Sequence, residues 1–90
     1  MASNKKKIKA AVIGVGNMGR HHARIYSNLE GVELVAVSDV NKKAEEIAKS
    51  YGCKFYLDYN KMLDKEKIDV VSVVVPTKLH KKIALDCIKL

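Results

Sequence analysis

Hydrophobic residues gather in short runs along the chain, separated by longer segments in which apolar positions recur with a helical period. Short apolar runs bounded by turn residues predict strands, and the helical period predicts amphipathic helices. We expect strands over Ile8 to Ile13, Val32 to Ser38, Lys54 to Leu57 and Val70 to Val75. We expect helices over Met18 to Leu29, Asn41 to Tyr51, Asn60 to Leu63 and Leu79 to Leu90.

The apolar positions of each element also predict which side it buries. The run from Leu34 to Val37 is almost continuously hydrophobic, as expected of a parallel strand that is covered on both faces. The helix that follows it is expected to turn Ala44, Ile47 and Ala48 inward. The first and last helices are expected to bury Met18, Ala23, Ile25, Tyr26 and Leu29, and Leu79, Ile83, Ala84, Cys87 and Ile88, respectively.

Strands and helices alternate along the chain, and this order predicts an α/β fold with a parallel sheet and right-handed crossovers. The expected strand order is 3-2-1-4, a Rossmann-type sheet with helices on both faces and the first part of a doubly wound fold. Residues 1–7 are expected to form a basic flexible tail, and residues 8–90 one domain. Because the doubly wound sheet is incomplete, Val70 to Val75 would be an exposed apolar edge, so we expect a homo-oligomer.

The amino-acid composition indicates which kind of protein the chain is. The chain has 90 residues, of which 48% are hydrophobic and 30% charged, and this balance is typical of one small globular domain. Its longest apolar run is far shorter than the roughly 20 residues that span a membrane, so we expect a cytoplasmic protein without a membrane partner. Cys53 and Cys87 are far apart and have no metal-binding spacing, so neither a metal nor a disulfide is predicted.

The formal net charge of +7 raises the question of a nucleic-acid partner. Four of the lysines lie in the first nine residues, and the few aromatic residues do not alternate with basic ones. This distribution disfavours nucleic-acid binding. It indicates instead a solvated basic surface that attracts phosphorylated ligands weakly.

The strongest chemical signal is the glycine-rich segment from Gly14 to Gly19, which has the pattern GxGxxG. The pattern alone is weak, but here it follows a predicted strand directly and opens a predicted helix. An acidic residue, Asp39, lies 20 residues beyond Gly19 at the end of the second predicted strand. These three features together are typical of a dinucleotide-binding turn.

Each part of this pattern has a physical role. Gly14 permits a tight turn, Gly16 lets a pyrophosphate approach the backbone, and Gly19 lets the helix pack near the first strand. The helix N-terminus offers N–H groups to the phosphates. Asp39 can accept hydrogen bonds from the adenosine ribose and would repel a 2′-phosphate, which favours NAD over NADP.

Several alternatives stay open at this point. Lys42 and Lys43 could reach a 2′-phosphate, so NADP is the second choice of cofactor. Spacing alone also allows FAD or S-adenosylmethionine. The glycines could simply shape a turn while Asp39 caps the following helix.

Three segments resemble the Gfo/Idh/MocA oxidoreductases, the relatives of glucose–fructose oxidoreductase and inositol dehydrogenase. They are Ala11 to Ala23, Val35 to Asp39 with the helix that follows, and Val73 to His80. The resemblance runs from about Lys7 to Leu90. The third segment departs from the family's usual Thr-Pro-Asn, because Val75 and Thr77 flank Pro76, whereas His80 agrees. Backbone contacts to the nicotinamide ribose could survive this change, but a side-chain hydrogen bond from Val75 could not.

The motif and the resemblance together predict a set of cofactor-binding residues. The backbone turn and its helix supply one part, the end of the second strand another, and the turn after the fourth strand a third. The set is Gly14, Gly16, Asn17, Met18, Gly19, Asp39, Val75, Pro76, Thr77 and His80.

The resemblance implies hydride transfer between a nicotinamide cofactor and a sugar, inositol or related polyol. In the family, catalysis uses a Lys in a Glu-Lys-Pro segment and an Asp and a His from a second domain. None of these is present here, so no catalytic residue is predicted within the chain, which is expected to end before them. The alternative is a non-catalytic nucleotide-binding or redox-sensing module.

Overall fold

The structure is a computed structural model that describes residues 7–14, 16–75 and 77–89. Its strands are β1 (Ile8–Ile13), β2 (Val32–Ser38), β3 (Lys54–Tyr56) and β4 (Val70–Val73). Its helices are α1 (Asn17–Asn28), α2 (Glu45–Tyr51), α3 (Tyr59–Lys65) and α4 (Thr77–Lys89), and a 3-10 turn over Lys42–Ala44 precedes α2. No helix of the described residues has both the length and the apolar character needed to cross a membrane.

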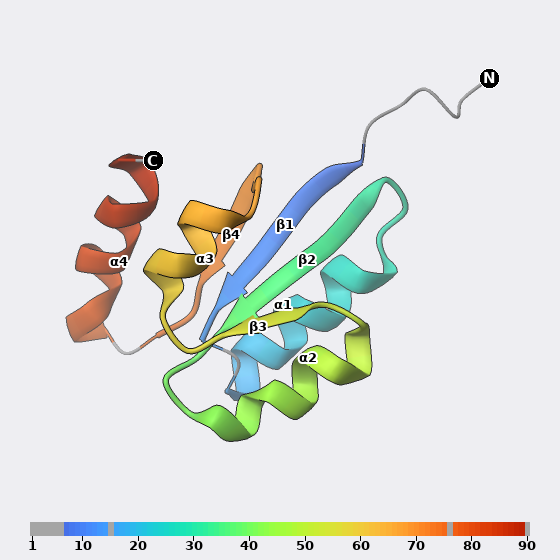
Figure 1. Ribbon diagram of the computed structural model, residues 1–90, viewed down its shortest axis with the longest axis horizontal. Coiled ribbons are helices and arrows are strands. Elements are labelled where there is room, and N and C mark those ends of the chain that lie inside the picture. The colour runs from blue at the N-terminus through green and yellow to red at the C-terminus, as the bar shows by residue number, and fades with distance from the viewer. Residues whose placement is uncertain (1–6, 15, 76, 90) are drawn as a thin grey trace.

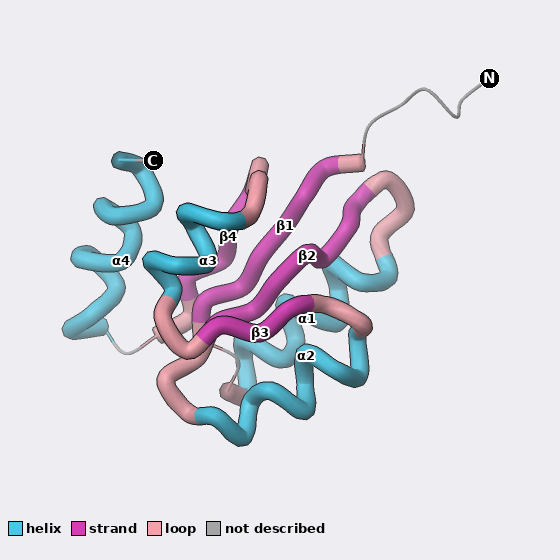
Figure 2. Tube along the Cα trace, viewed as in Figure 1, coloured by secondary structure: helices cyan, strands magenta, loops and turns pink. Residues whose placement is uncertain are grey.

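The strands form one parallel sheet in the order β3-β2-β1-β4, which confirms the predicted order and fold class. Helices α1 and α2 cover one face of this sheet, and α3 and α4 cover the other (Figure 1). The tube view shows the strands as the middle layer between these two pairs (Figure 2). All four strands therefore end at the same edge, where the turns that lead into the helices meet.

The sheet separates two hydrophobic cores. One contains Val12, Leu34 and Val37 with residues of α1 and α2, and the other contains Ala11 and Ala36 with residues of α3 and α4. The pairing of β1 with β2 shifts between Ala10 and Ala11, so that Val35 is an extra residue in β2. Val35 and Ala36 consequently both pack against the core beneath α3 and α4. The continuous apolar run of β2 thus supplies both cores.

Three of the residues predicted to be buried are exposed. Ile25 is 52% exposed, Leu29 48% and Ile88 78%. Ile25 lies two positions from the buried Ala23 and therefore points to nearly the opposite side of α1. Leu29 follows the last turn of α1, and Ile88 is five positions from the buried Ile83, also off the inward side of its helix.

The boundaries of most elements lie within two residues of the predicted ones; helix α4, for example, begins at Thr77 instead of Leu79. Two differences lie near the carboxyl ends of the strands. The second helix begins as a 3-10 turn rather than as α-helix, because the side chain of Asn41 accepts a hydrogen bond from Lys43 N–H at 3.0 Å and caps it there. Strand β4 ends at Val73 instead of Val75. Val74 N–H still bonds to the carbonyl of Ile13 at 2.8 Å, which holds the segment after β4 against the end of β1.

Candidate functional site

The turn between β1 and α1 is the tightest part of the structure. Gly14 adopts a positive φ of 88° and donates its N–H to the carbonyl of Ser38 at 2.7 Å. A Cβ at this position would overlap the carbonyl group of Val74, lying 2.9 Å from its carbon. Glycine is required here because the ends of β1, β2 and the segment after β4 converge on this residue.

Gly19 and Gly16 face opposite environments. Gly19 is buried, and a Cβ on it would overlap the carbonyl group of Gly14, 2.7 Å from its carbon. Gly16 is exposed, and among the described residues other than its chain neighbours no heavy atom lies within 4 Å of the position its Cβ would take. Gly19 thus lets α1 approach β1, and Gly16 leaves open the space in front of the helix.

The N-terminus of α1 faces this open space without a competing anion of its own. Gly16 is the N-cap residue and provides no side chain, and its carbonyl accepts the N–H of Arg20 at 2.8 Å. Among the described residues, the first turn holds no acidic group. Helix N–H groups and the helix dipole favour a negatively charged ligand at such an end. The side chains of Asn17 and Met18 lie outside the described part of the chain.

Asp39 follows β2 at the same sheet edge. Its N–H donates to the carbonyl of Tyr56 at 3.1 Å, and its Oδ1 accepts the N–H of Asn41 at 2.8 Å. The side chain therefore shapes the turn into the next helix. It is also partly exposed and lines a cleft, so both the capping role and a ligand-binding role are compatible with its position.

A cleft of about 520 Å³ connects these features. Gly14 and Gly16 of the turn after β1, Asp39 after β2, and Val74 and Val75 after β4 all line it. The rest of the lining is largely apolar. Its described residues are Ile13, Gly14, Gly16, Ser38, Asp39, Val40, Leu57, Tyr59, Val74, Val75, Lys82 and Ile83.

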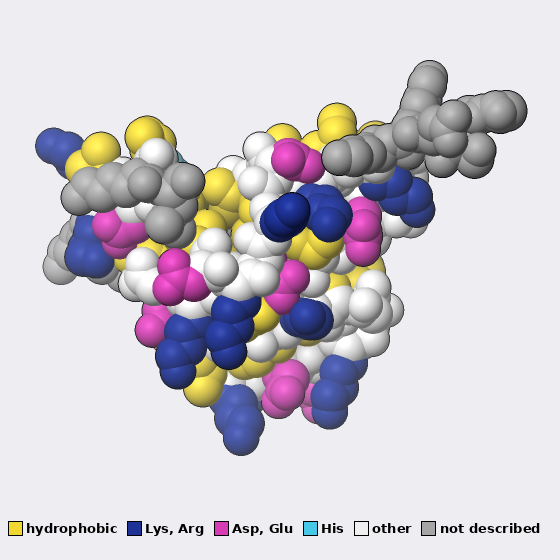
Figure 3. Space-filling view, turned by 45° about the horizontal axis from the view of Figure 1, so that its top comes forward, with side chains coloured by type: hydrophobic (Ala, Val, Ile, Leu, Met, Phe, Trp, Pro, Cys, Tyr) yellow, Lys and Arg dark blue, Asp and Glu magenta, His cyan; other side chains and the backbone are white. Residues whose placement is uncertain are grey.

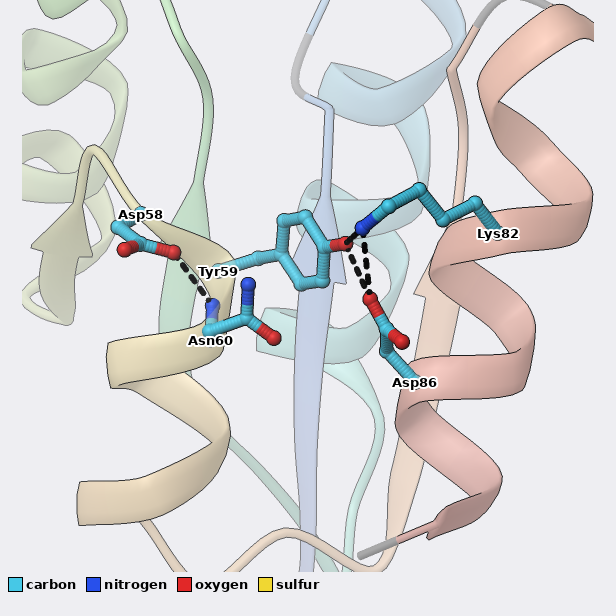
Figure 4. A network of polar contacts seen from close by, with 5 residues as sticks. All are labelled: Asp58, Tyr59, Asn60, Lys82 and Asp86. Atoms are coloured by element: carbon cyan, nitrogen blue, oxygen red, sulfur yellow. Dashed lines mark hydrogen bonds and ion pairs between the residues drawn. The ribbon is translucent and has the colours of Figure 1, made fainter.

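Two of these lining residues, Tyr59 and Lys82, form a polar network with Asp86, which lies outside the described lining (Figure 4). Tyr59 reaches from the first turn of α3 towards α4 and donates its hydroxyl to Asp86 Oδ2 at 2.5 Å. Lys82 Nζ lies 3.2 Å from both the Tyr59 oxygen and Asp86 Oδ2. These hydrogen bonds to Tyr59 and Asp86 raise the pKa of Lys82, so its ammonium stays charged at neutral pH. Asp58 fixes the start of α3 by accepting the N–H of Asn60 at 2.9 Å.

The chain matches, over residues 8–90, the model of the oxidoreductase family with an NAD-binding Rossmann fold that is named after Gfo, Idh and MocA. The chain belongs to this family.

Among its relatives, inositol 2-dehydrogenase 2 of Mycolicibacterium vanbaalenii is 36% identical over 85 residues, which are 91% of this chain and 25% of that protein. The solved structure of myo-inositol 2-dehydrogenase from Lactobacillus plantarum superposes with a TM-score of 0.87 at 36% identity, over 93% of this chain and 26% of that one. The structure of myo-inositol dehydrogenase from Lactobacillus casei, solved with NAD(H) and myo-inositol, superposes with a TM-score of 0.85 at 34% identity. The superposition covers 93% of this chain and 26% of that one. The chain thus spans about a quarter of the length of these proteins.

The residues of this Gfo/Idh/MocA chain suit the adenosine and pyrophosphate parts of NAD. The open face of Gly16 and the uncapped start of α1 fit a pyrophosphate. The carboxylate of Asp39 fits a ribose diol, and the apolar lining fits the faces of a base. These features lie on one continuous cleft, so a single extended ligand can contact all of them.

The predicted site residues are only partly brought together by the fold. Gly14, Gly16, Asp39 and Val75 line the cleft, and Gly19 supports it from behind. Pro76 and the side chain of Thr77 lie outside the described residues. His80 is on α4, exposed, and does not belong to the described lining of the cleft.

Several cleft residues were not predicted from the sequence. Val40 and Leu57 follow strands as exposed apolar residues, and Tyr59, Lys82 and Asp86 form the polar network. The spacing of Lys82 and Asp86, four residues apart on a helix, was a usable signal for their ion pair. The approach of Tyr59 from 23 residues away was not visible in the sequence.

The remaining candidates have structural roles. His22 Nδ1 and Tyr26 Oη lie 3.1 Å and 2.7 Å from the hydroxyl of Ser72, so they pack α1 against β4. Cys53 is partly buried, and this burial raises the pKa of its thiol to about 11, which makes the thiolate scarce at neutral pH.

Proposed function

We propose that this chain is the dinucleotide-binding domain of an NAD-dependent oxidoreductase that acts on a sugar, inositol or related polyol. The observation that carries the proposal is the shared cleft of Gly16 and Asp39, which offers a phosphate-accepting helix end and a ribose-binding carboxylate to one ligand. The family match and relatives that act on inositols support the substrate class.

Within the proposal, each part of the chain has a defined task. The N–H groups at the start of α1 bind the pyrophosphate next to Gly16. Asp39 accepts hydrogen bonds from the hydroxyls of the adenosine ribose, and Val75, Pro76, Thr77 and His80 are assigned to the nicotinamide ribose on the family resemblance alone. When bound, NAD supplies a nicotinamide ring that accepts hydride from a carbinol carbon. The catalytic Lys, Asp and His that the family uses would come from outside these residues.

NAD is proposed over NADP because of charge. The carboxylate of Asp39 would lie next to a 2′-phosphate and repel it. Lys42 and Lys43 are exposed in the 3-10 turn that follows, and they keep NADP as the second choice. We also propose a cytoplasmic protein without a nucleic-acid partner. Lysines and arginines on the face in Figure 3 are interspersed with acidic side chains, which supports the latter point.

The proposal is tested by calorimetric titration of the chain with NAD and NADP, together with an Asp39→Ala variant. We expect the chain to bind NAD more tightly than NADP, and the variant to bind NAD roughly tenfold more weakly. A charged hydrogen bond contributes about 1.5–3 kcal/mol and about 1.4 kcal/mol corresponds to tenfold in affinity. The preference against NADP should shrink in the variant, since the repelling charge is gone.

An Asp64→Ala variant is the matched control, because it removes the same charge from an exposed position outside the cleft. It should bind both dinucleotides as the parent chain does. Failure of the parent chain to bind either dinucleotide at millimolar concentration would contradict the proposed function. Equal weakening in both variants would show that net charge, not the Asp39 carboxylate, governs binding.

We also propose that the chain forms a homo-oligomer. Strand β4 pairs only with β1 within the described sheet, and Val70 at its start is 42% exposed. Unpaired edge strands with apolar side chains recruit further strands. We expect the chain to self-associate in sedimentation velocity as its concentration rises, and a Val70→Lys variant to do so less. A parent chain that stays monomeric at high concentration would refute this prediction.

A further inference from the structure

Tyr59 and Lys82, which form a polar network with Asp86, line the same cleft in which the proposed function places the adenine base. Gly16 marks the pyrophosphate and Asp39 the adenosine ribose, and the base is joined directly to that ribose. Beyond Asp39, the cleft is bounded by apolar side chains from Val40 and Leu57. Apart from Ser38 and Asp39, the described lining residues bring polar side-chain groups into the cleft only at Tyr59 and Lys82.

The donors and acceptors of this network are fixed by Asp86. An ionised carboxylate only accepts hydrogen bonds, so the hydroxyl hydrogen of Tyr59 must point at Asp86 Oδ2, 2.5 Å away. Lys82 only donates, and its bonds to Tyr59 and Asp86 use two of its three N–H groups. The Tyr59 oxygen accepts one of these bonds, so towards a ligand Tyr59 presents its second lone pair as an acceptor, and Lys82 presents its third N–H as a donor.

This pair is complementary to the edge of adenine. Adenine offers an amino donor at N6 beside the ring acceptor N7, whereas a base with a carbonyl at the 6-position offers two acceptors there. Tyr59 cannot donate to such a carbonyl while its hydrogen is committed to Asp86. We propose that Tyr59 and Lys82, ordered by Asp86, read the polar edge of the base and select adenine dinucleotides. This inference rests on the proposed function, since it assumes that the cleft binds a dinucleotide.

The test is calorimetric titration of the chain with NAD and with its hypoxanthine analogue, which differs only by a carbonyl in place of the adenine amino group. We expect NAD to bind about fivefold more tightly, as one net hydrogen bond of about 1 kcal/mol implies. In Tyr59→Phe, which keeps the ring and loses the acceptor, this ratio should fall to about one. Asp86→Leu keeps the approximate shape but cannot accept a hydrogen bond, so the Tyr59 hydroxyl becomes free to donate elsewhere and the ratio should fall there as well.

Lys82→Met is compared with Lys81→Met, a change of the same charge at an exposed neighbouring position outside the cleft lining. Lys82→Met should weaken NAD binding about fivefold and Lys81→Met should leave it unchanged. Circular dichroism of each variant checks that the fold is kept. A network that merely ties α3 to α4 would weaken both dinucleotides equally in Tyr59→Phe and leave their ratio at the parent value.

The two proposals fail in different ways. Equal binding of the two dinucleotides by the parent chain, or an unchanged ratio in both Tyr59→Phe and Asp86→Leu, would overturn the assignment of Tyr59 and Lys82 and leave the proposed function standing. Absence of NAD binding by the parent chain would overturn both.

Discussion

Replacing Gly19 with alanine is expected to destabilise the domain by about 3 kcal/mol, the upper part of the range for added groups in a packed interior. The new Cβ would overlap the carbonyl group of Gly14, which is backbone and cannot rotate away as a side chain would. Gly14 is itself held by its N–H bond to the Ser38 carbonyl. Helix α1 would have to move off the sheet, and Ala23 would lose its buried position.

Urea unfolding followed by circular dichroism measures this effect, with Gly16→Ala as the matched control. Among the described residues, the same methyl group at Gly16 meets no heavy atom within 4 Å apart from its chain neighbours. Gly16→Ala should therefore lower the free energy of unfolding by less than about 1 kcal/mol, the difference between glycine and alanine at an N-cap. Small domains have free energies of unfolding of about 5 kcal/mol, so Gly19→Ala should unfold at a much lower urea concentration than Gly16→Ala. Similar midpoints for the two variants would contradict the close packing of α1 on β1.

The contrast between these glycines also shows what the sequence could predict. The GxGxxG pattern, its position between a strand and a helix, and Asp39 at the end of the next strand were enough to predict the fold, the strand order and one side of the cleft. They sufficed because each depends on local backbone geometry and on spacing along the chain. Periodicity likewise located every strand and helix, because burial of one side of an element imposes its period.

Features that depend on tertiary contact could not be predicted in this way. Val74 and Val75 are as β-prone as the rest of their run, yet β4 ends at Val73 and both residues line the cleft, although Val74 N–H still bonds to the carbonyl of Ile13. Tyr59 and Lys82 come from two helices that only the parallel crossovers bring to the same face. Their pairing is set by the fold, so no pattern within either helix indicates it.

Replacing Gly16 with valine is expected to weaken dinucleotide binding at least tenfold while leaving the fold intact. Gly16 has extended backbone with a negative φ of −69°, so a side chain does not meet the strain of a positive φ, and the space around its Cβ position is open among the described residues. The branched side chain would occupy the place where the pyrophosphate meets the start of α1. Each hydrogen bond to a charged phosphate that is lost costs about 1.5–3 kcal/mol, and about 1.4 kcal/mol corresponds to tenfold.

Titration with ADP and with adenosine, followed by NMR chemical shifts, separates crowding at the phosphates from a general loss of the cleft. ADP should bind Gly16→Val much more weakly than the parent chain. Adenosine carries no phosphate and should bind both chains equally, through Asp39 and the apolar lining. If adenosine weakened as much as ADP, the valine would have disturbed the whole cleft. If ADP bound both chains equally, the phosphates would have to lie away from Gly16, and the glycine-rich turn would owe its sequence to packing alone.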